Sequence, residues 1–316
     1  MKRFWYYFKW FVRRANRKVR VKMHLQIKPT KRCYGRRFSN IETTQERISK
    51  LIMSGKPFLA GRCGGIEALV CNESLKVKKS PKNNFSRKII SKAHLNAGFI
   101  NPTREKLLEF SSTYECCVKE CDVLGSMTNN REDYLITSFL PKESLITDIG
   151  NLEPYYSSNP WTKSLRGKKV LVINPFAESI KKQYYSNRTK LFPSSDILPD
   201  FELDALKAVQ SIAGNECGFD DWFKALDYMF EEAMKRDFDV AIIGCGAYGF
   251  PLGLKIKQAG KQAIHLGGAT QILFGVWGSR WDSIAEVKKF KNDFWISPSE
   301  DEKPKNFNQV ENGCYW

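Results

Sequence analysis

Short apolar runs that each lead through a turn into a helical pattern recur along this chain, and this alternation constrains its fold more than any other feature. The clearest runs occupy residues 58–60, 168–176, 239–243 and 262–266. Strands that alternate with helices predict an α/β domain with a mainly parallel sheet and flanking helices. We therefore expect a Rossmann-like fold.

The chain of 316 residues divides by composition into three parts. Residues 41–290 carry the alternating pattern and have the length of one α/β domain. Residues 1–40 are basic, and residues 291–316 lack apolar periodicity. We expect a single folded domain, with a basic aromatic arm before it and a loosely ordered tail after it.

Residues 1–22 combine positive charge with aromatic side chains. They contain nine Lys or Arg residues and no acid, and residues 4–12 are mostly aromatic. This block is shorter than the roughly 20 apolar residues that cross a bilayer, but its composition suits a helix on an anionic membrane surface. We expect a cytoplasmic protein held peripherally at the inner face of the membrane. A solvated basic tail that contacts RNA is the alternative.

The charge and the cysteines narrow the range of partners. A formal net charge of +17 implies anionic partners, but composition does not choose among nucleic acid, membrane head groups and phosphorylated substrates. Basic residues interleaved with aromatics are sparse outside residues 1–40, so we expect no nucleic-acid partner. The nine cysteines include no paired C-x-x-C motifs, and they predict reduced thiols rather than a zinc site.

The turn in "LAGRCGGIEAL" has the features of an anion site. Ligands of open α/β sheets bind beyond the carboxyl ends of the strands, and here Arg62 follows an apolar run. Gly64 and Gly65 would let backbone approach a ligand, and a helix start favours an anion. Glu67 falls in the first helical turn. It can cap the helix or ligate a divalent cation, and both interpretations stay open.

Two further turns follow the same logic. In "VLVINPFAESI", Asn174 and Glu178 lie on either side of a strand-to-helix turn. In "DVAIIGCGAYGF", three glycines form a G-x-G-x-x-G pattern, namely Gly244, Gly246 and Gly249. A dinucleotide site usually has an acid at the end of the next strand, but that strand ends in His265, Leu266 and Gly267. We expect a turn that cradles phosphate or ribose, and no NAD or FAD.

Three blocks of sequence resemble the GT-D-type glycosyltransferases, which act in bacterial glycan assembly. "GRCGGIEAL" resembles the R-F-G-D-G-E signature, and "IIGCGAYGFPLGLKIKQAGKQAIHLGG" resembles the later G-x-x-A-Y-G-x-P-L segment. "HLGGATQILFGVWGSRW" resembles the ending of a related branch associated with surface polysaccharide synthesis. The resemblance covers residues 45–285 and implies a Rossmann-like fold and a nucleotide-sugar donor.

The resemblance places the family's D-x-E pair only in part. Arg62, Gly64 and Glu67 match the signature, but Gly65 stands where the family has aspartate. In the family this pair is tied to the metal and to the nucleotide diphosphate. Three possibilities stay open: Glu67 alone holds Mn²⁺ or Mg²⁺, another carboxylate such as Glu178 or Asp122 contributes, or basic residues neutralise the diphosphate without metal.

The candidate site residues fall into three groups, each with a structural role as the alternative. The catalytic candidates are Glu67, which is also the metal candidate, and His265 as a base. The donor-binding candidates are Arg62, Gly64, Gly65, Asn174, Gly244, Gly246, Tyr248 and Gly249. The acceptor or sugar contacts are Gln183, Arg188, Gln271, Arg280 and Trp281; Phe274 and Trp277 are further stacking surfaces.

The leading hypothesis is a glycosyltransferase that transfers a sugar from a nucleotide-sugar donor to a growing surface polysaccharide, such as a capsule, or to another glycan. The acceptor would be a glycan or a lipid-linked sugar held near the membrane by the arm. The first alternative is an NAD(P)-dependent oxidoreductase that acts on a nucleotide sugar. The second is a non-catalytic nucleic-acid-binding protein, which only the charge suggests.

Overall fold

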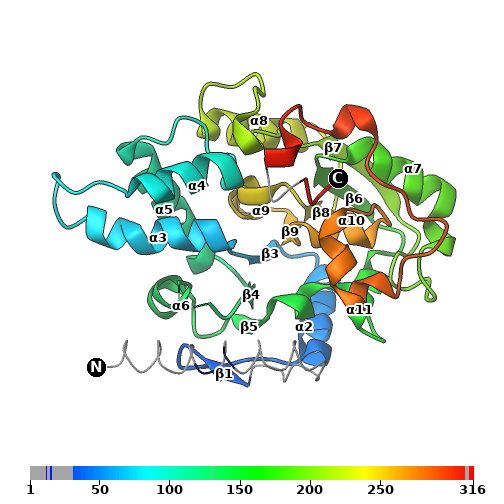
Figure 1. Ribbon diagram of the computed structural model, residues 1–316. Helices are drawn as coiled ribbons and strands as arrows, with labels where there is room; N and C mark the ends of the chain where they lie inside the picture. Colours follow the sequence, from blue (N-terminus) through cyan, green and yellow to red (C-terminus); the bar gives the residue numbers. More distant parts are fainter. Residues whose placement is uncertain (1–11, 13–14, 16–30, 130, 310–312) are drawn as a thin grey trace.

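The domain is built on a parallel sheet of seven strands (Figure 1). The computed structural model describes residues 12, 15, 31–129, 131–309 and 313–316. The strands are β3 (Phe58–Arg62), β4 (Val123–Ser126), β5 (Leu145–Asp148), β6 (Lys169–Asn174), β7 (Glu202–Lys207), β8 (Val240–Ile243) and β9 (Gln262–His265). Their order across the sheet is β5-β4-β3-β9-β8-β6-β7, and every pair is parallel. The predicted Rossmann-like α/β fold is confirmed.

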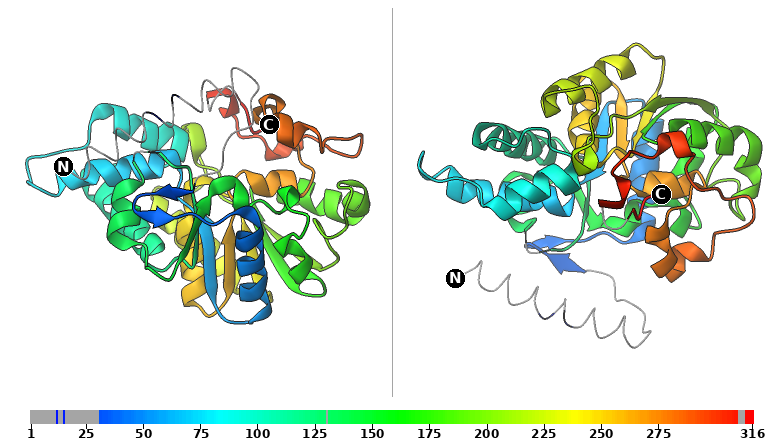
Figure 2. Two further views of the ribbon diagram at one scale, coloured as in Figure 1. Left: turned by 90° about the horizontal axis from the view of Figure 1, so that it is seen from below. Right: turned by 45° about the horizontal axis from the view of Figure 1, so that its top comes forward.

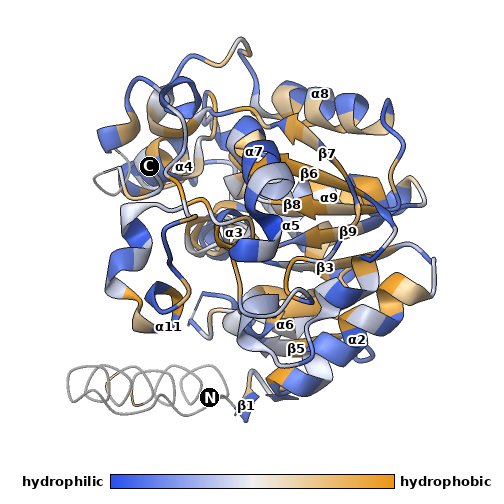
Figure 3. Cartoon of the chain, turned by 90° about the vertical axis from the view of Figure 1, so that its right-hand side faces the viewer, coloured by the Kyte–Doolittle hydropathy of each residue, from blue (hydrophilic) through white to orange (hydrophobic). Residues whose placement is uncertain are grey.

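Helices cover both faces of the sheet because successive strand side chains point to opposite sides. In β8, Ala241 and Ile243 pack on one face, while Val240 and Ile242 pack on the other. The first face carries α3 (Gly65–Val77), α4 (Arg87–Ala97), α5 (Arg104–Lys119), α6 (Asp133–Phe139), α8 (Trp222–Met234) and α9 (Gly249–Gln258). The second carries α2 (Ile41–Met53), α7 (Ala177–Asn187), α10 (Ala269–Leu273) and α11 (Ala285–Lys288). Figure 3 shows the apolar strands enclosed between these layers.

The centre of the sheet is where the connections diverge. The chain leaves β3 through α3 on the first face and builds outward to β4 and β5. It leaves β6 through α7 on the second face and returns inward through β8 to β9, which pairs with β3. Ligands of such sheets bind at this kind of reversal, beyond the carboxyl ends of the strands.

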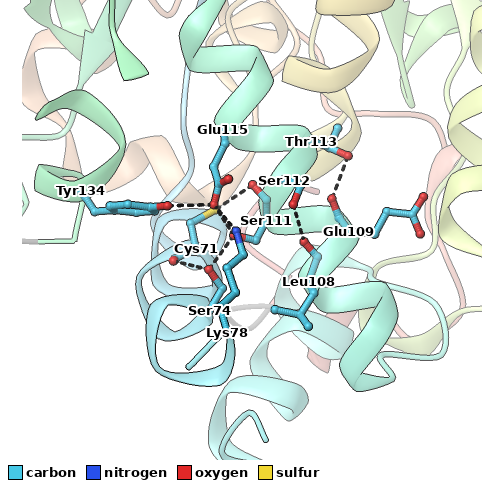
Figure 4. Close-up of polar contacts among 10 residues, drawn as sticks. All are labelled: Cys71, Ser74, Lys78, Leu108, Glu109, Ser111, Ser112, Thr113, Glu115 and Tyr134. Carbon is cyan, nitrogen blue, oxygen red and sulfur yellow. Dashed lines mark hydrogen bonds and ion pairs between the residues drawn. The ribbon is translucent and has the colours of Figure 1, made fainter. Parts of the chain in front are cut away.

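A polar network joins three helices of the first face (Figure 4). The Glu115 Oε1 atom on α5 accepts hydrogen bonds from Lys78 Nζ at 2.7 Å, Tyr134 OH at 3.1 Å and Ser111 Oγ at 3.2 Å. Burial and the Glu115 charge raise the pKa of Tyr134 to about 12. Lys78 follows the last residue of α3, and Tyr134 lies in the first turn of α6. The network therefore fixes both helices against α5.

All nine cysteines are free thiols, and several of them are buried.

The domain extends beyond both predicted boundaries. A hairpin of β1 (Arg32–Cys33) and β2 (Arg36–Arg37) precedes α2, and the Ser39 N–H donates to the Ile146 carbonyl. The folded part therefore begins by residue 31 rather than 41.

The predicted membrane-surface arm, residues 1–22, lies outside the described residues except for residues 12 and 15. No helix in the described chain has the length and apolar character to cross a bilayer.

The expectation of a loosely ordered tail is wrong for residues 291–309. Trp295 is buried, the Ile296 N–H donates to the Gly275 carbonyl at 3.1 Å, and Glu302 is only 2% exposed. Glu302 bonds to α7, and Figure 2 shows the C-terminal segment lying beside that helix. The polar sequence hid this packing because a few specific anchors, rather than a periodic apolar face, hold the segment.

Candidate functional site

The first candidate turn, after β3, is filled by the side chain of Glu67. A Cβ atom at Gly64 would lie 2.0 Å from Glu67 Oε2, so the carboxyl group folds back over Gly64. Burial raises the pKa of Glu67, while the backbone N–H groups of Glu67 and Ile66 and the charge of Arg62 lower it. The structure thus favours the capping role of Glu67 at the start of α3, and Gly64 makes room for that carboxyl group.

The turn after β4 is also closed by an acid of the chain. The carboxylate of Glu132, which is 2% exposed, accepts hydrogen bonds from Ser126 Oγ, the Met127 N–H and the Asn129 N–H at 2.8, 3.0 and 3.2 Å. Tyr34 OH donates to the same carboxylate at 3.3 Å. The backbone donors of this turn are therefore already satisfied.

Glu302 closes the turn after β6. Its carboxylate accepts hydrogen bonds from the Glu178 and Ser179 N–H groups at 3.0 and 3.2 Å, and also from the Ser179 hydroxyl. Asn174 is 2% exposed and bonds to the Gly244 carbonyl and the Phe176 N–H, so it shapes the turn. Its predicted donor contact stays a prediction, and the geometry favours the structural role.

Replacing Glu302 with alanine is expected to lower the free energy of unfolding by about 2 kcal/mol, because buried N–H donors of α7 lose their charged acceptor. Urea unfolding measures the change. The matched control is Glu300→Ala, because the Glu300 side chain is 86% exposed and, among the described residues, pairs only with Lys303. That variant should change stability by less than about 0.5 kcal/mol. Equal stability losses in the two variants would contradict the capping role of Glu302.

The turn after β8 differs from these three turns, because its described backbone is open at Gly246. Gly244 and Gly249 serve packing: a Cβ atom would lie 2.6 Å from Asn174 Nδ2 at the first and 2.2 Å from His265 Nδ1 at the second. Gly246 differs, because it is exposed in a buried run, has a φ of +59° and has no atom within 4 Å of a Cβ position. Glycine alone adopts this left-handed conformation without strain. Of the three motif glycines, Gly246 is therefore the one suited to offer backbone to a ligand, at the start of η6 (Gly246–Tyr248), which precedes α9.

Arg62 is the last residue of β3, and β9 lies between this strand and β8. Its guanidinium packs on Gly267, where a Cβ atom would lie 2.5 Å from Arg62 Nη2. The side chain is half-buried and makes no hydrogen bond or ion pair with the described residues. Glu67, Glu153 and His265 all lie within its electrostatic range. A half-buried cation whose donors are unused by the protein is suited to bind an anion.

His265 does not have the surroundings of a catalytic base. It is 4% exposed, its Nδ1 lies 3.2 Å from the Ile243 carbonyl oxygen, and its ring packs beneath Gly249. Burial, and then the charge of Arg62, lowers the pKa of His265 to about 3. The structure thus favours the strand-histidine alternative.

The imidazole of His265 is expected to stay neutral down to about pH 4 in the folded protein. The unfolded chain takes up this proton near pH 6.5, so the contribution of His265 to stability is complete above that pH and is lost as the pH falls toward 3. The loss is about 1.4 kcal/mol per pH unit. Buried carboxyl groups with raised pKa values contribute with the opposite sign, so urea unfolding should compare the wild type with His265→Gln between pH 4 and 7. A stability difference that does not change with pH would contradict the lowered pKa.

Three of the predicted acceptor contacts gather near Gly268. Gln271 Nε2 donates to the Tyr315 carbonyl at 2.8 Å, and the Trp281 ring would lie 3.5 Å from a Cβ at Gly268. The Arg280 guanidinium lies over the Tyr315 ring, 5.1 Å from its centroid. This group forms a wall beside the strand end that carries Arg62.

The other predicted contacts lie elsewhere. Gln183 is fully buried and donates to the Gly275 and Phe294 carbonyls. Arg188 pairs with Asp200 at 3.1 Å, and Asp200 directly precedes β7, so this pair lies at the amino edge of the sheet. For both residues the structure favours the structural alternative, and their ligand contacts stay predictions. The aromatic candidates Tyr248, Phe274 and Trp277 are buried in the core, and Tyr248 stacks on Trp222 at 4.6 Å.

The carboxylates near the first turn do not fit a protein-held divalent cation. Among the described residues, no group of three or more potential ligands comes together. Glu178 is exposed and pairs with Lys181, while Asp122 binds the Leu59 N–H and Lys257 at the amino edge. Glu67 is thus left as a single carboxylate that is already engaged by backbone N–H groups.

Sequence reasoning missed the acids that close the turns. Ser299 and Glu302 form an S-x-x-E capping box, a signal that could have indicated a structured segment. Sequence reasoning also missed Glu153, which lies near Arg62. No motif indicates its position, because it stands in a turn-rich loop after the short strand β5.

Comparisons with known proteins leave the family open: no protein-family model, no curated protein and no solved structure matches this chain.

Proposed function

We propose that the protein is a glycosyltransferase that binds a nucleotide-sugar donor at the carboxyl edge of the sheet. One observation carries the proposal. Carboxylates of the chain itself fill the turns after β3, β4 and β6, whereas the turn after β8 presents the exposed backbone of Gly246 at the same edge of the sheet as Arg62, which has no hydrogen-bond or ion-pair partner among the described residues. Exposed backbone after β8 and a guanidinium at the end of β3, with β9 between the two strands, suit a diphosphate, which needs both donors and positive charge.

The proposed sugar transfer requires positive charge next to the departing diphosphate. In sugar transfer, the acceptor hydroxyl attacks the anomeric carbon while the nucleoside diphosphate leaves with the electron pair of the broken bond. Arg62 would bind the diphosphate and stabilise the negative charge that grows on the leaving oxygen. Arg280, on the wall beside Gly268, is a second cation for the same role. Glu67 would cap the start of α3, and its carboxyl group would interact electrostatically with Arg62.

The acceptor side of the proposal keeps the surface-glycan hypothesis. Residues 1–22 would bind an anionic membrane surface from the cytoplasmic side and bring the site close to a lipid-linked or polymeric glycan. The high positive charge of the chain supports an anionic surface as partner.

Turnover of nucleotide sugars tests the proposal. Purified full-length protein would be incubated with UDP-glucose, UDP-galactose, UDP-N-acetylglucosamine, GDP-mannose and dTDP-rhamnose, with and without Mn²⁺, and the release of nucleoside diphosphate measured. We expect release from at least one donor, and more in the presence of a membrane-derived glycan fraction. Failure to release diphosphate from any donor, together with reduction of NAD⁺ or NADP⁺ by a nucleotide sugar, would favour the oxidoreductase instead.

A further inference from the structure

Glu153 lies at the site although no sequence motif indicates it. It joins η1 (Ile149–Leu152) to η2 (Pro154–Tyr156), where the chain returns across the carboxyl edge after β5. Buried Gln45 holds this segment: its Nε2 donates to the Asn151 carbonyl at 2.8 Å, and its Oε1 accepts the Trp161 N–H at 2.9 Å. The backbone that carries Glu153 is therefore fixed from α2.

The carboxyl group of Glu153 has one oxygen held and one free. Tyr155 OH donates to Oε2, while Oε1 makes no hydrogen bond with any described residue. The side chain is half-buried, and both Arg62 and Arg280 lie within its electrostatic range. Glu153 is therefore close enough to sense both cations that the proposed function assigns to the diphosphate.

We propose that Glu153 is the general base of the transfer reaction, an inference that rests on the proposed function. The acceptor oxygen forms a bond to the anomeric carbon, and the bond from that carbon to the diphosphate oxygen breaks. The acceptor proton passes to Oε1 of Glu153, and the electron pair of the broken bond leaves with the diphosphate, next to Arg62. Such a direct displacement inverts the anomeric configuration.

The groups around Glu153 adjust its basicity in both directions. Burial raises the pKa of Glu153, and the Tyr155 hydrogen bond and the charges of Arg62 and Arg280 lower it. Tyr156 is another titratable group nearby, and burial, followed by the charges of Glu153 and Glu286, raises its pKa well above the usual value. A base works best when its pKa lies near the working pH, so a raised carboxyl pKa suits this role.

The other candidate bases near Arg62 are already engaged. Glu67 binds backbone N–H groups at the start of α3, and His265 is buried against Ile243 and Gly249. Glu153 combines a fixed position, a free oxygen and a neighbouring cation.

Two variants and one control test the proposal, using the donor that the wild type turns over fastest. Glu153→Gln should lower kcat for diphosphate release roughly 100-fold or more, with calorimetric affinity for UDP or GDP unchanged within about twofold. Tyr155→Phe keeps the ring but removes the hydrogen bond that lowers the Glu153 pKa. The acidic limb of its kcat profile should therefore move to higher pH. The control Glu143→Gln alters an exposed acid just before β5 and should change neither quantity.

The outcomes separate this inference from the proposed function. Wild-type kcat in Glu153→Gln, or an unmoved acidic limb in Tyr155→Phe, would overturn the role of Glu153 and leave the glycosyltransferase proposal intact. Retention of the anomeric configuration in the product would also overturn it. No diphosphate release by the wild type from any donor would overturn both.

Discussion

Replacing Arg62 with alanine is expected to weaken the binding of nucleoside diphosphates about 100-fold, which corresponds to about 2.7 kcal/mol. Hydrogen bonds from a guanidinium to an anion are strong because the donor is charged, and Arg62 has no partner among the described residues that would compete for it. Arg62→Lys should recover only part of the loss, because an ammonium group cannot form the bidentate contact. Isothermal titration with UDP, GDP and dTDP measures these affinities.

The control for Arg62 is Arg166→Ala. Arg166 is 55% exposed and pairs with Asp196 at 2.7 Å, just before β6 begins at the amino edge. Both variants remove one positive charge, so a general effect of net charge would weaken binding equally in the two. Equal affinities for the wild type and Arg62→Ala would remove Arg62 from the site.

Replacing Gly246 with alanine should also weaken diphosphate binding about 100-fold, because a Cβ would stand where the phosphate approaches the backbone. Alanine in a left-handed conformation costs about 1 kcal/mol of stability by itself. Gly260 supplies the matched control, because it has a φ of +87°, has no atom within 4 Å of a Cβ position and lies between α9 and β9. Gly260→Ala should lose similar stability in urea and keep full affinity. Equal affinity losses in the two variants would mean that backbone strain, rather than a phosphate contact, is responsible.

The fold could be predicted from the sequence because each β-α unit carries its own local pattern. The apolar runs near 58–60, 168–176, 239–243 and 262–266 all became strands of one parallel sheet. β5 was missed because it has four residues and leads directly into a turn-rich stretch. Local periodicity does not identify such a short edge strand, which forms by pairing with β4.

The site was predictable only in part, since burial depends on contacts between distant segments. Gly246 and Gly249 belong to one motif, yet only Gly246 is exposed, because the ring of His265 from the next strand packs against Gly249. Glu302 reaches the Glu178 N–H across 124 residues of chain, and no local pattern encodes that contact. Gln183 appeared suitable for a sugar contact, but its amide group is used by two carbonyls inside the domain.

A crystal structure of the protein with UDP or GDP, whichever binds more tightly, tests the central claim most directly. We predict that the diphosphate lies beyond the ends of β3, β9 and β8, with a phosphate oxygen within hydrogen-bond distance of both the Arg62 guanidinium and the Gly246 N–H. A nucleotide bound at another edge of the sheet, or a diphosphate that contacts neither Arg62 nor Gly246, would contradict it.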